Sequence, residues 1–177
     1  MSLHLSVVSI EGSHLEALPG VLKELGYVID SETTVNSSEQ AFRAAEEHPD
    51  RFHVTKVAYF EDGFTHLLDL EMVLSHDDVW LEFTRTRSCR VVGWICEGAS
   101  STFELDVCDR GRWIRNVVAI EGEVRASTGE PLEEEEGVDW SVAGEQDVLA
   151  VVDRLGATSD FSADRNYRVY RLDESRM

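Results

Sequence analysis

The sequence predicts an α+β fold, in which a mainly antiparallel sheet of hairpins and a meander carries amphipathic helices packed on one face. The first observation is three strand-like runs, 90–97, 102–108 and 113–120, joined by short turns. The second is the FELDV sequence of the middle run (103–107), where apolar and acidic residues alternate as in a strand with one buried and one wet face. The third is a set of segments with apolar residues every three or four positions, each opened by helix-capping residues.

The N-terminal segment predicts a strand followed by a helix. Residues 3–10 alternate with a period of two, and Gly12 ends the run. Ser13 and Glu16 then form an S-x-x-E capping box ahead of leucines at helical spacing. Pro19 lies inside this pattern, where it lacks a backbone donor, so the helix is expected to be kinked or to begin at the proline.

The segment from 27 to 49 repeats this order. Residues 27–35 are predicted to form a weak strand. Ser37 and Gln40 form a second capping box, which opens a short helix that continues to about His48 and is stopped by Pro49. Both predicted helices are amphipathic, so each is expected to pack against the sheet.

The middle of the chain predicts a hairpin and a third helix. The apolar-rich runs 53–60 and 64–70 are separated by Glu61-Asp62-Gly63, a turn with glycine where a positive φ is needed. The SHDD sequence (75–78) then resembles an N-cap for a helix that ends at about Arg87.

The second half is predicted to be mostly sheet. The three runs named at the outset form a meander, and residues 121–126 either extend its last strand or add a short one. The apolar pattern predicts a last helix over 145–156 and a final strand over 167–172. The order of the strands in the sheet cannot be derived from these patterns.

Length and composition are those of one globular domain. The chain has 177 residues, of which 42% are hydrophobic and 29% charged, which suffices for one core. We expect a single α+β domain over 1–177, with a strand-helix subregion at 1–50 and a sheet-rich region at 51–177.

The charge of the chain is strongly acidic. The 35 Asp and Glu residues against 16 Lys and Arg give a formal net charge of -19. Such a surface repels nucleic-acid phosphates and anionic membranes, whereas it attracts a basic protein and speeds the encounter. A basic protein is therefore the expected partner, with no nucleic acid and no membrane, and the oligomeric state is left open.

Cysteine usage and the N-terminus indicate the compartment. Cys89, Cys96 and Cys108 form no CxxC pair and lie in or beside strand-like runs, which predicts buried free thiols in a reducing cytosol. The N-terminal MSLHLSVVSIEG has no basic flank and no long apolar run, and no stretch approaches the roughly 20 apolar residues of a membrane span. We therefore expect a cytoplasmic protein.

No assembled catalytic or cofactor motif occurs in the sequence. G-x-S-x-G, G-x-G-x-x-G, the Walker loop and H-E-x-x-H are all absent. His76 stands beside Asp77 and Asp78, a group that the first turn of a helix explains without a metal. Cys96 is a candidate nucleophile, although a cysteine in a strand is usually a small apolar filler. No metal, cofactor or catalytic residue is therefore predicted, and the pattern favours a non-enzymatic protein without excluding an enzyme.

The acidic segment GEPLEEEEGVDW (129–140) is the first candidate binding site. A run of glutamates repels itself and stays hydrated, which is typical of a solvated loop or a first helical turn, but it can also form an anionic contact surface for a basic partner. Trp140 closes the segment, either as an anchor for the partner or as a residue that pins the loop to the protein body. The candidate contact residues are Glu133, Glu134, Glu135, Glu136 and Trp140.

Clustered arginines are the second candidate, for an anionic ligand. They lie at a helix-to-strand junction and around a hairpin turn, and they are Arg85, Arg87, Arg112 and Arg115. Guanidinium groups bind anions through bidentate hydrogen bonds. In a chain this acidic, local charge balance through salt bridges is the alternative role.

Two stretches of the second half carry a resemblance to a known family. They are VVGWICEGASSTFELDVCDRGRWIRNVV (91–118) and GEPLEEEEG (129–137). Over about residues 54–156 the chain resembles an uncharacterised family of small bacterial domains, mainly actinobacterial, with a tryptophan-bearing strand, a DGR hairpin and a GEPLPEE loop before a last helix. Here Arg110 is interposed in the hairpin turn and Glu133 replaces the second proline of the loop. The resemblance implies the fold and a bacterial origin, and it assigns no site.

These observations lead to two hypotheses of different classes. The first is a non-enzymatic, acidic protein-interaction module of the bacterial cytoplasm, in one version an immunity-type protein that neutralises a basic toxin. The alternative is a small-ligand-binding or enzymatic domain that uses the clustered arginines with a carboxylate or Cys96. A polar pocket that joins the arginines would favour the alternative, and an unbroken acidic surface would favour interaction.

Overall fold

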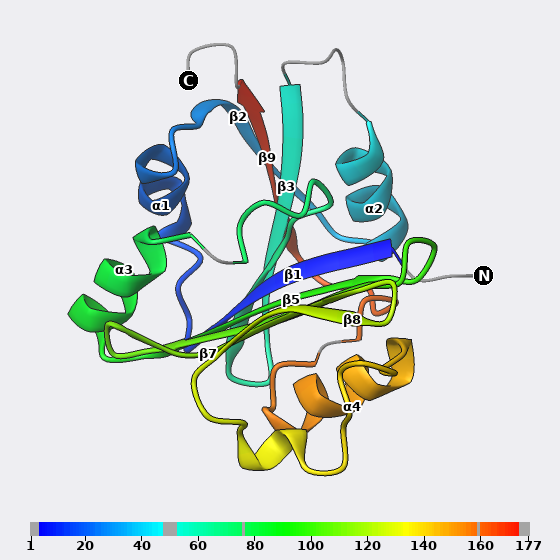
Figure 1. Cartoon of the computed structure of the whole chain (residues 1–177). Coiled ribbons are helices and arrows are strands. Elements are labelled where there is room, and N and C mark those ends of the chain that lie inside the picture. The colour runs from blue at the N-terminus through cyan, green and yellow to red at the C-terminus, as the bar shows by residue number, and fades with distance from the viewer. Residues whose placement is uncertain (1–3, 48–52, 76, 159, 174–177) are drawn as a thin grey trace.

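The protein is described by a computed structural model over residues 4–47, 53–75, 77–158 and 160–173 (Figure 1). Within these ranges nine strands form one sheet in the order β2-β9-β3-β4-β1-β5-β6-β7-β8, and every neighbouring pair is antiparallel, which confirms the predicted α+β class. The strands are β1 (His4–Glu11), β2 (Val28–Val35), β3 (His53–Glu61), β4 (Phe64–Leu68), β5 (Arg90–Glu97), β6 (Thr102–Asp109), β7 (Arg112–Ile120), β8 (Glu123–Thr128) and β9 (Tyr167–Asp173). The helices are α1 (Leu18–Glu24), α2 (Ser38–Glu46), α3 (Val79–Arg87), α4 (Glu145–Arg154) and the 3₁₀ helix η1 (Glu133–Glu135).

The first strand lies in the middle of the sheet. β1 pairs with β4 on one side and with β5 on the other, and β9 lies between β2 and β3. The predicted meander is confirmed by β5, β6, β7 and β8, which follow in order along one half of the sheet. In Figure 1, β3 and β9 run in a different direction from β1 and β5, which shows how strongly the sheet twists.

Helices cover both faces of the sheet, which corrects the expectation of helices on one face. α1 and α3 pack on one apolar cluster, which includes Leu22, Trp80 and Phe83. α2 and α4 pack on the other, which includes Ala41 and Val148. Figure 1 shows α1 beside α3 and, across the sheet from them, α2 and α4.

The burial of the central strands explains why helices pack on both faces of the sheet. Residues 5–10 of β1 and 91–96 of β5 are all buried, whereas a strand with one wet face would be buried at every second residue. Apolar side chains therefore point to both sides of the sheet, and helices on one side would leave the other side in water.

The predicted start of α2 is confirmed and that of α1 is corrected. Ser37 Oγ accepts the amide proton of Gln40 at 3.3 Å, which satisfies a free N–H group at the helix end. α1 begins beside Pro19, the second of the two arrangements expected, and the residues before it form turns. The Ser13 capping box therefore does not open a helix. The predicted stop of α2 at 48–49 lies outside the described residues.

The segment before α3 packs on the sheet and corrects a second predicted cap. Ser75 does not cap the helix, because its hydroxyl donates to Glu104 Oε1 at 2.5 Å, while Asp77 accepts the amide proton of Val79 at 2.9 Å. The close approach depends on Gly93 of β5, where a Cβ would lie 2.7 Å from the Ser75 carbonyl oxygen. Only a residue without a side chain leaves room for this segment.

The same segment explains why an acidic residue of β6 is not in water. The alternation of FELDV predicts a wet face, but Asp106 is fully buried, opposite Gly93 in the sheet. Its Oδ1 accepts the side-chain amide of Asn116 at 2.6 Å. Burial raises the pKa of Asp106, and hydrogen bonds with Glu104, Asn116 and Ser75 oppose the rise.

A buried ion cluster holds the other end of this segment. Lys56 of β3 is fully buried and pairs with Asp69 and Glu71. The other Asp69 oxygen accepts the amide protons of Val73 and Leu74 at 2.8 and 2.7 Å. Burial acts to lower the pKa of Lys56, but the carboxylates of Asp69 and Glu71 outweigh it and hold the pKa above its ordinary value. The segment is therefore tied to β3 at one end and to β6 at the other.

His66 of β4 is a buried, neutral histidine. Its Nδ1 lies 3.0 Å from Ser9 Oγ, and the Ser9 hydroxyl donates to the Ala157 carbonyl oxygen at 3.1 Å. The hydroxyl has one proton, so it is left to accept from the imidazole Nδ1–H. Burial lowers the pKa of His66 from 6.5 to about 4.

A methyl group at Gly93 is expected to destabilise the fold. Gly93→Ala should lower the free energy of unfolding by about 1–3 kcal/mol, because the Ser75 backbone blocks the new Cβ. Gly20→Ala in α1 is the matched control, since a Cβ there meets nothing within 4 Å, and it should raise stability by roughly 0.5 kcal/mol through helix propensity. Urea unfolding measures both. Equal effects of the two substitutions would contradict the packing role of Gly93.

The protein is expected to become less stable as the pH is lowered, because His66 becomes protonated on unfolding. Its folded pKa is depressed, so the unfolded chain binds more protons between pH 6.5 and about 4, and the fold loses stability as the pH falls through that window. The loss amounts to about 3 kcal/mol at most. The free energy of unfolding of His66→Gln, measured by denaturant titration across this range, should depend less on pH. An unchanged slope in this variant would show that other groups cause the loss.

Candidate functional site

A buried ion pair lies beneath the acidic segment. Arg115 of β7 is 3% exposed and Glu135 of η1 is 5% exposed. The guanidinium donates from Nε to Oε1 at 2.7 Å and from Nη2 to Oε2 at 2.8 Å, which is a bidentate pairing. Trp140 Nε1 donates to Oε2 at 2.8 Å and the Leu132 amide to Oε1 at 3.0 Å. Four donors therefore converge on one carboxylate.

The remaining donors of Arg115 hold the chain that leads into the acidic segment. Nη1 donates to the Ser127 hydroxyl at 2.9 Å and to the carbonyl oxygens of Thr128 and Gly129 at 3.2 and 3.4 Å. Gly129 has a φ of +78°, and a Cβ there would lie 2.1 Å from the carbonyl oxygen of Ile114. The glycine that opens GEPLEEEEG is therefore required by a close approach of two backbones.

The pair is ionic at neutral pH. Burial by itself raises the pKa of Glu135, but the Arg115 guanidinium, the Leu132 amide and the Trp140 indole outweigh it, so the pKa lies below its ordinary value. Removal of one partner from such a pair leaves a buried charge without compensation, at a cost of about 3–5 kcal/mol.

The candidate contact residues of this segment separate into buried and surface groups. Glu135 and Trp140 are buried, so they are not available to a partner, and this part of the hypothesis is corrected. Trp140 instead pins the segment to the body through Glu135. Glu133 and Glu136 are exposed and Glu134 is half-buried. The four glutamates are thus neither one binding patch nor a free loop.

The carboxylates left at the surface of this part of the chain belong to segments that lie beside one another. Between residues 121 and 147 the chain has ten acidic residues and one basic residue, Arg125. Gly122 in the β7–β8 turn approaches the carbonyl oxygen of Ser141, where a Cβ would lie 3.3 Å away, so this turn lies beside the segment that follows η1. η1 itself lies next to α4 (Figure 1). The acidic surface consists of Glu121, Glu133, Glu134, Glu136 and Asp139.

The structure does not bring the four candidate arginines together. Arg115 is paired on the face that carries α4, whereas Arg85 and Arg87 lie on α3, across the sheet. Arg85 binds Glu82 of the same helix at 2.6 and 2.9 Å, and Arg112 is exposed at the start of β7. The alternative reading as local salt bridges therefore holds for Arg85 and Arg115.

Three hollows among the described residues lie on different parts of the surface, and none of the three joins two of these arginines. A groove of about 330 Å³ between α1 and α3 includes Arg87, and a hollow of about 270 Å³ at the edge of β7 and β8 includes Arg115. A third hollow of about 440 Å³ lies beside α2, at Phe42 and Leu70.

The candidate nucleophiles are not placed for catalysis. Cys96 is fully buried, and burial together with the Glu145 carboxylate raises its pKa to about 12, so it is protonated at neutral pH. Ser9 and His66 form a hydrogen-bonded pair that the sequence patterns did not indicate. The Ser9 proton points to the Ala157 carbonyl oxygen, so the imidazole is a donor to Ser9 and not its base.

Residues 4–47, 53–75, 77–158 and 160–173 contain neither a candidate metal centre nor a helix that could span a membrane. In these ranges no three or more His, Cys, Asp or Glu side chains are grouped as metal ligands, and His76 lies outside them. No helix in the same part of the chain has both the length and the apolar character to cross a membrane.

Comparison of the chain with protein families, with curated proteins and with solved structures gives no match.

Loss of the Glu135 charge is expected to destabilise the protein strongly. Glu135→Gln should lower the free energy of unfolding by about 3 kcal/mol, because Arg115 loses its counter-charge inside the core. Glu133→Gln is the matched control, since Glu133 is exposed, and should be nearly neutral. Urea unfolding near neutral pH measures both free energies.

The pH dependence provides a second check on the same pair. The folded pKa of Glu135 is lowered, so its contribution is complete above the ordinary glutamate pKa and is lost as the pH falls through the folded value. The difference in the free energy of unfolding between wild type and Glu135→Gln should therefore decrease over that acidic range. A constant difference would indicate that the substitution acts through packing alone.

Proposed function

We propose that the protein is a non-enzymatic interaction module that binds a basic protein through the acidic surface. The observation that carries the proposal is the anchoring of Glu135 by Arg115 and Trp140. This anchor fixes the 3₁₀ turn, so the side chains of Glu133, Glu134 and Glu136 project from a backbone that is already ordered. A partner then binds without the entropic cost of ordering a loop.

The electrostatics of this region support a cationic partner. Arg125 pairs with Glu123, so it adds little net positive charge to the acidic surface. Arg154 on α4 donates to the backbone carbonyl oxygens of Glu134 and Glu136 at 2.6 and 3.1 Å and stabilises the turn. A concentrated negative field of this kind raises the association rate of a basic protein and disfavours acidic ones.

The alternative hypothesis is a small-ligand-binding or enzymatic domain that uses the clustered arginines. It requires that these arginines line one common pocket. Arg87 and Arg115 line separate hollows, and Arg115 is already paired. The buried thiols Cys89, Cys96 and Cys108 are consistent with a reducing compartment. An immunity-type protein of the bacterial cytoplasm, which covers the cationic surface of a toxin, is the version of the interaction role that fits this chemistry.

The proposal is tested by affinity capture from the native cell lysate with three forms of the protein. One variant carries Gln at Glu133, Glu134 and Glu136 and leaves Glu135 intact. The control carries Gln at three exposed acids in or directly after α2: Glu39, Glu46 and Glu47. Both variants lose three carboxylates, so they have the same net charge and differ only in where the charge is lost.

If the acidic surface is a specific binding site, the two variants should behave differently. A basic protein should be retained at low salt by wild type and control, released at high salt, and lost from the first variant, with an association rate lowered on the order of tenfold. Equal losses in both variants would show non-specific attraction to the net charge. Retention by all three forms, or salt-independent binding, would also contradict the proposal.

A further inference from the structure

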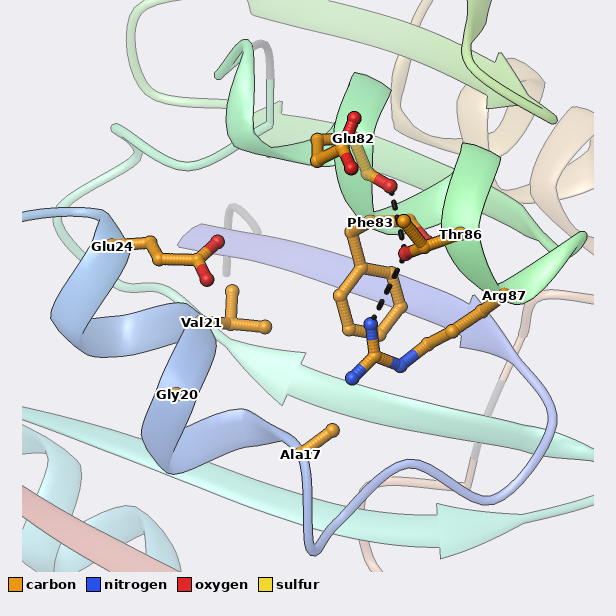
Figure 2. A pocket seen from close by; sticks show the side chains of 8 residues that line it. All are labelled: Ala17, Gly20, Val21, Glu24, Glu82, Phe83, Thr86 and Arg87. Atoms are coloured by element: carbon orange, nitrogen blue, oxygen red, sulfur yellow. Dashed lines mark hydrogen bonds between the residues drawn. The ribbon is translucent and has the colours of Figure 1, made fainter.

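The groove between α1 and α3 is formed by the packing of two helices on the same face of the sheet. Its volume is about 330 Å³, at the lower end of the range for small-ligand sites. The floor is apolar, because Val21 and Phe83 are each 4% exposed and belong to the core. Gly20 leaves space along the α1 wall, since a Cβ there would meet nothing within 4 Å. The lining residues are Ala17, Gly20, Val21, Glu24, Glu82, Phe83, Thr86 and Arg87 (Figure 2).

One end of the groove is basic. The guanidinium of Arg87 lies over the Phe83 ring, 4.2 Å from its centroid. Nη1 donates to the Thr86 hydroxyl at 3.4 Å, and that hydroxyl donates to the Glu82 carbonyl oxygen at 2.9 Å. No carboxylate among the described residues pairs with Arg87, unlike Arg85 one turn away, which binds Glu82. The guanidinium therefore has N–H donors available to an anion.

The other end is acidic. Figure 2 shows the Glu24 carboxylate, at the end of α1, extending toward α3, with Val21 and Phe83 between it and the Arg87 guanidinium. Glu24 is exposed. Glu82 on the opposite wall is engaged by Arg85, and that contact lowers the pKa of Glu82. The groove thus has opposite charges toward its two ends and apolar residues between them.

We propose that this groove binds a zwitterion in which an ammonium group and a carboxylate are separated by an apolar chain. The carboxylate meets Arg87, the ammonium group meets Glu24, and the methylene chain lies along Val21 and Phe83. A simple anion would leave Glu24 repelling it, and a simple cation would leave Arg87 repelling it, so the pattern discriminates against both. This site is independent of the acidic surface, which lies across the sheet beside α4.

Two sources can supply this chemistry: a free ω-amino acid, or the C-terminal lysine of a peptide. The first experiment is therefore an NMR titration of the isotope-labelled full-length protein with ε-aminocaproate, with caproate and hexylamine as probes that each lack one charge. An N-acetylated peptide ending in lysine, with its C-terminus free or amidated, forms the second arm. The amide signals of Gly20, Val21 and Thr86 report on the groove.

Variants of the groove make the titration specific. Gly20→Leu fills the groove, and its thermal unfolding should show a fold at least as stable as wild type. Arg87→Met keeps an apolar stem over Phe83 and removes the charge, and Glu24→Gln removes the opposite charge. Glu39→Gln on α2 is the control for loss of one exposed carboxylate.

The proposal expects saturable shifts of the groove amides with ε-aminocaproate or with the free-carboxylate peptide. The dissociation constant should rise about two- to fivefold in Arg87→Met and in Glu24→Gln, as for exposed charge pairs, and binding should vanish in Gly20→Leu and be unchanged in Glu39→Gln. Tighter binding of the peptide than of ε-aminocaproate would assign the source to a chain terminus. Absence of saturable shifts with both zwitterions, equal binding of caproate or hexylamine, or unaltered binding by Gly20→Leu would overturn it.

Discussion

The burial of β1 and β5 on both faces of the sheet is the constraint on which the rest of the structure depends. Six consecutive residues in each strand are removed from water, which requires a helical layer on either side. α1 and α3 supply one layer, and α2 with α4 the other. Because these pairs are placed by the sheet, the α1–α3 groove and the turn next to α4 occupy opposite faces of the molecule.

Charge burial is the second organising theme of this acidic protein. Lys56 and Arg115 are buried bases, and each is paired with a carboxylate that also receives backbone amide protons. In both places the acid belongs to a connecting segment and the base to a strand. A loop that would otherwise be held only by its ends is thereby fixed to the sheet, since a buried charge is stable only when its partner stays in place.

The acidic segment shows how a core interaction shapes a surface. Glu135 turns inward to Arg115, and the turn this requires directs Glu133 and Glu136 toward solvent. Trp140 closes the arrangement by donating to the same carboxylate. The high local density of negative charge is therefore supported by one positive charge beneath it, which lets the chain concentrate carboxylates that would repel one another in a free loop.

The sequence by itself determined the elements whose signals are local. Turn chemistry and apolar periodicity located the meander of β5 to β7, the Ser37 cap and the hairpin at Asp62 and Gly63, because propensity and pattern act within a few residues. Tertiary packing overrode local patterns elsewhere. The FELDV alternation indicated a wet face, yet Asp106 is buried, because Gly93 in the neighbouring strand admits the segment before α3.

The continuous apolar run of β5 indicates that the strand is buried on both faces, but it does not indicate which helices pack on each face.

The candidate sites also depend on contacts that the local sequence does not indicate. Four consecutive glutamates are equivalent in the sequence, and only the position of Arg115, twenty residues away in β7, decides that Glu135 is a core residue while its neighbours are surface. The groove that contains Arg87 and Glu24 likewise exists only because two helices distant in the chain pack side by side. Composition fixes how much charge a chain carries, whereas long-range contacts fix which charges are paired and which are left for a ligand.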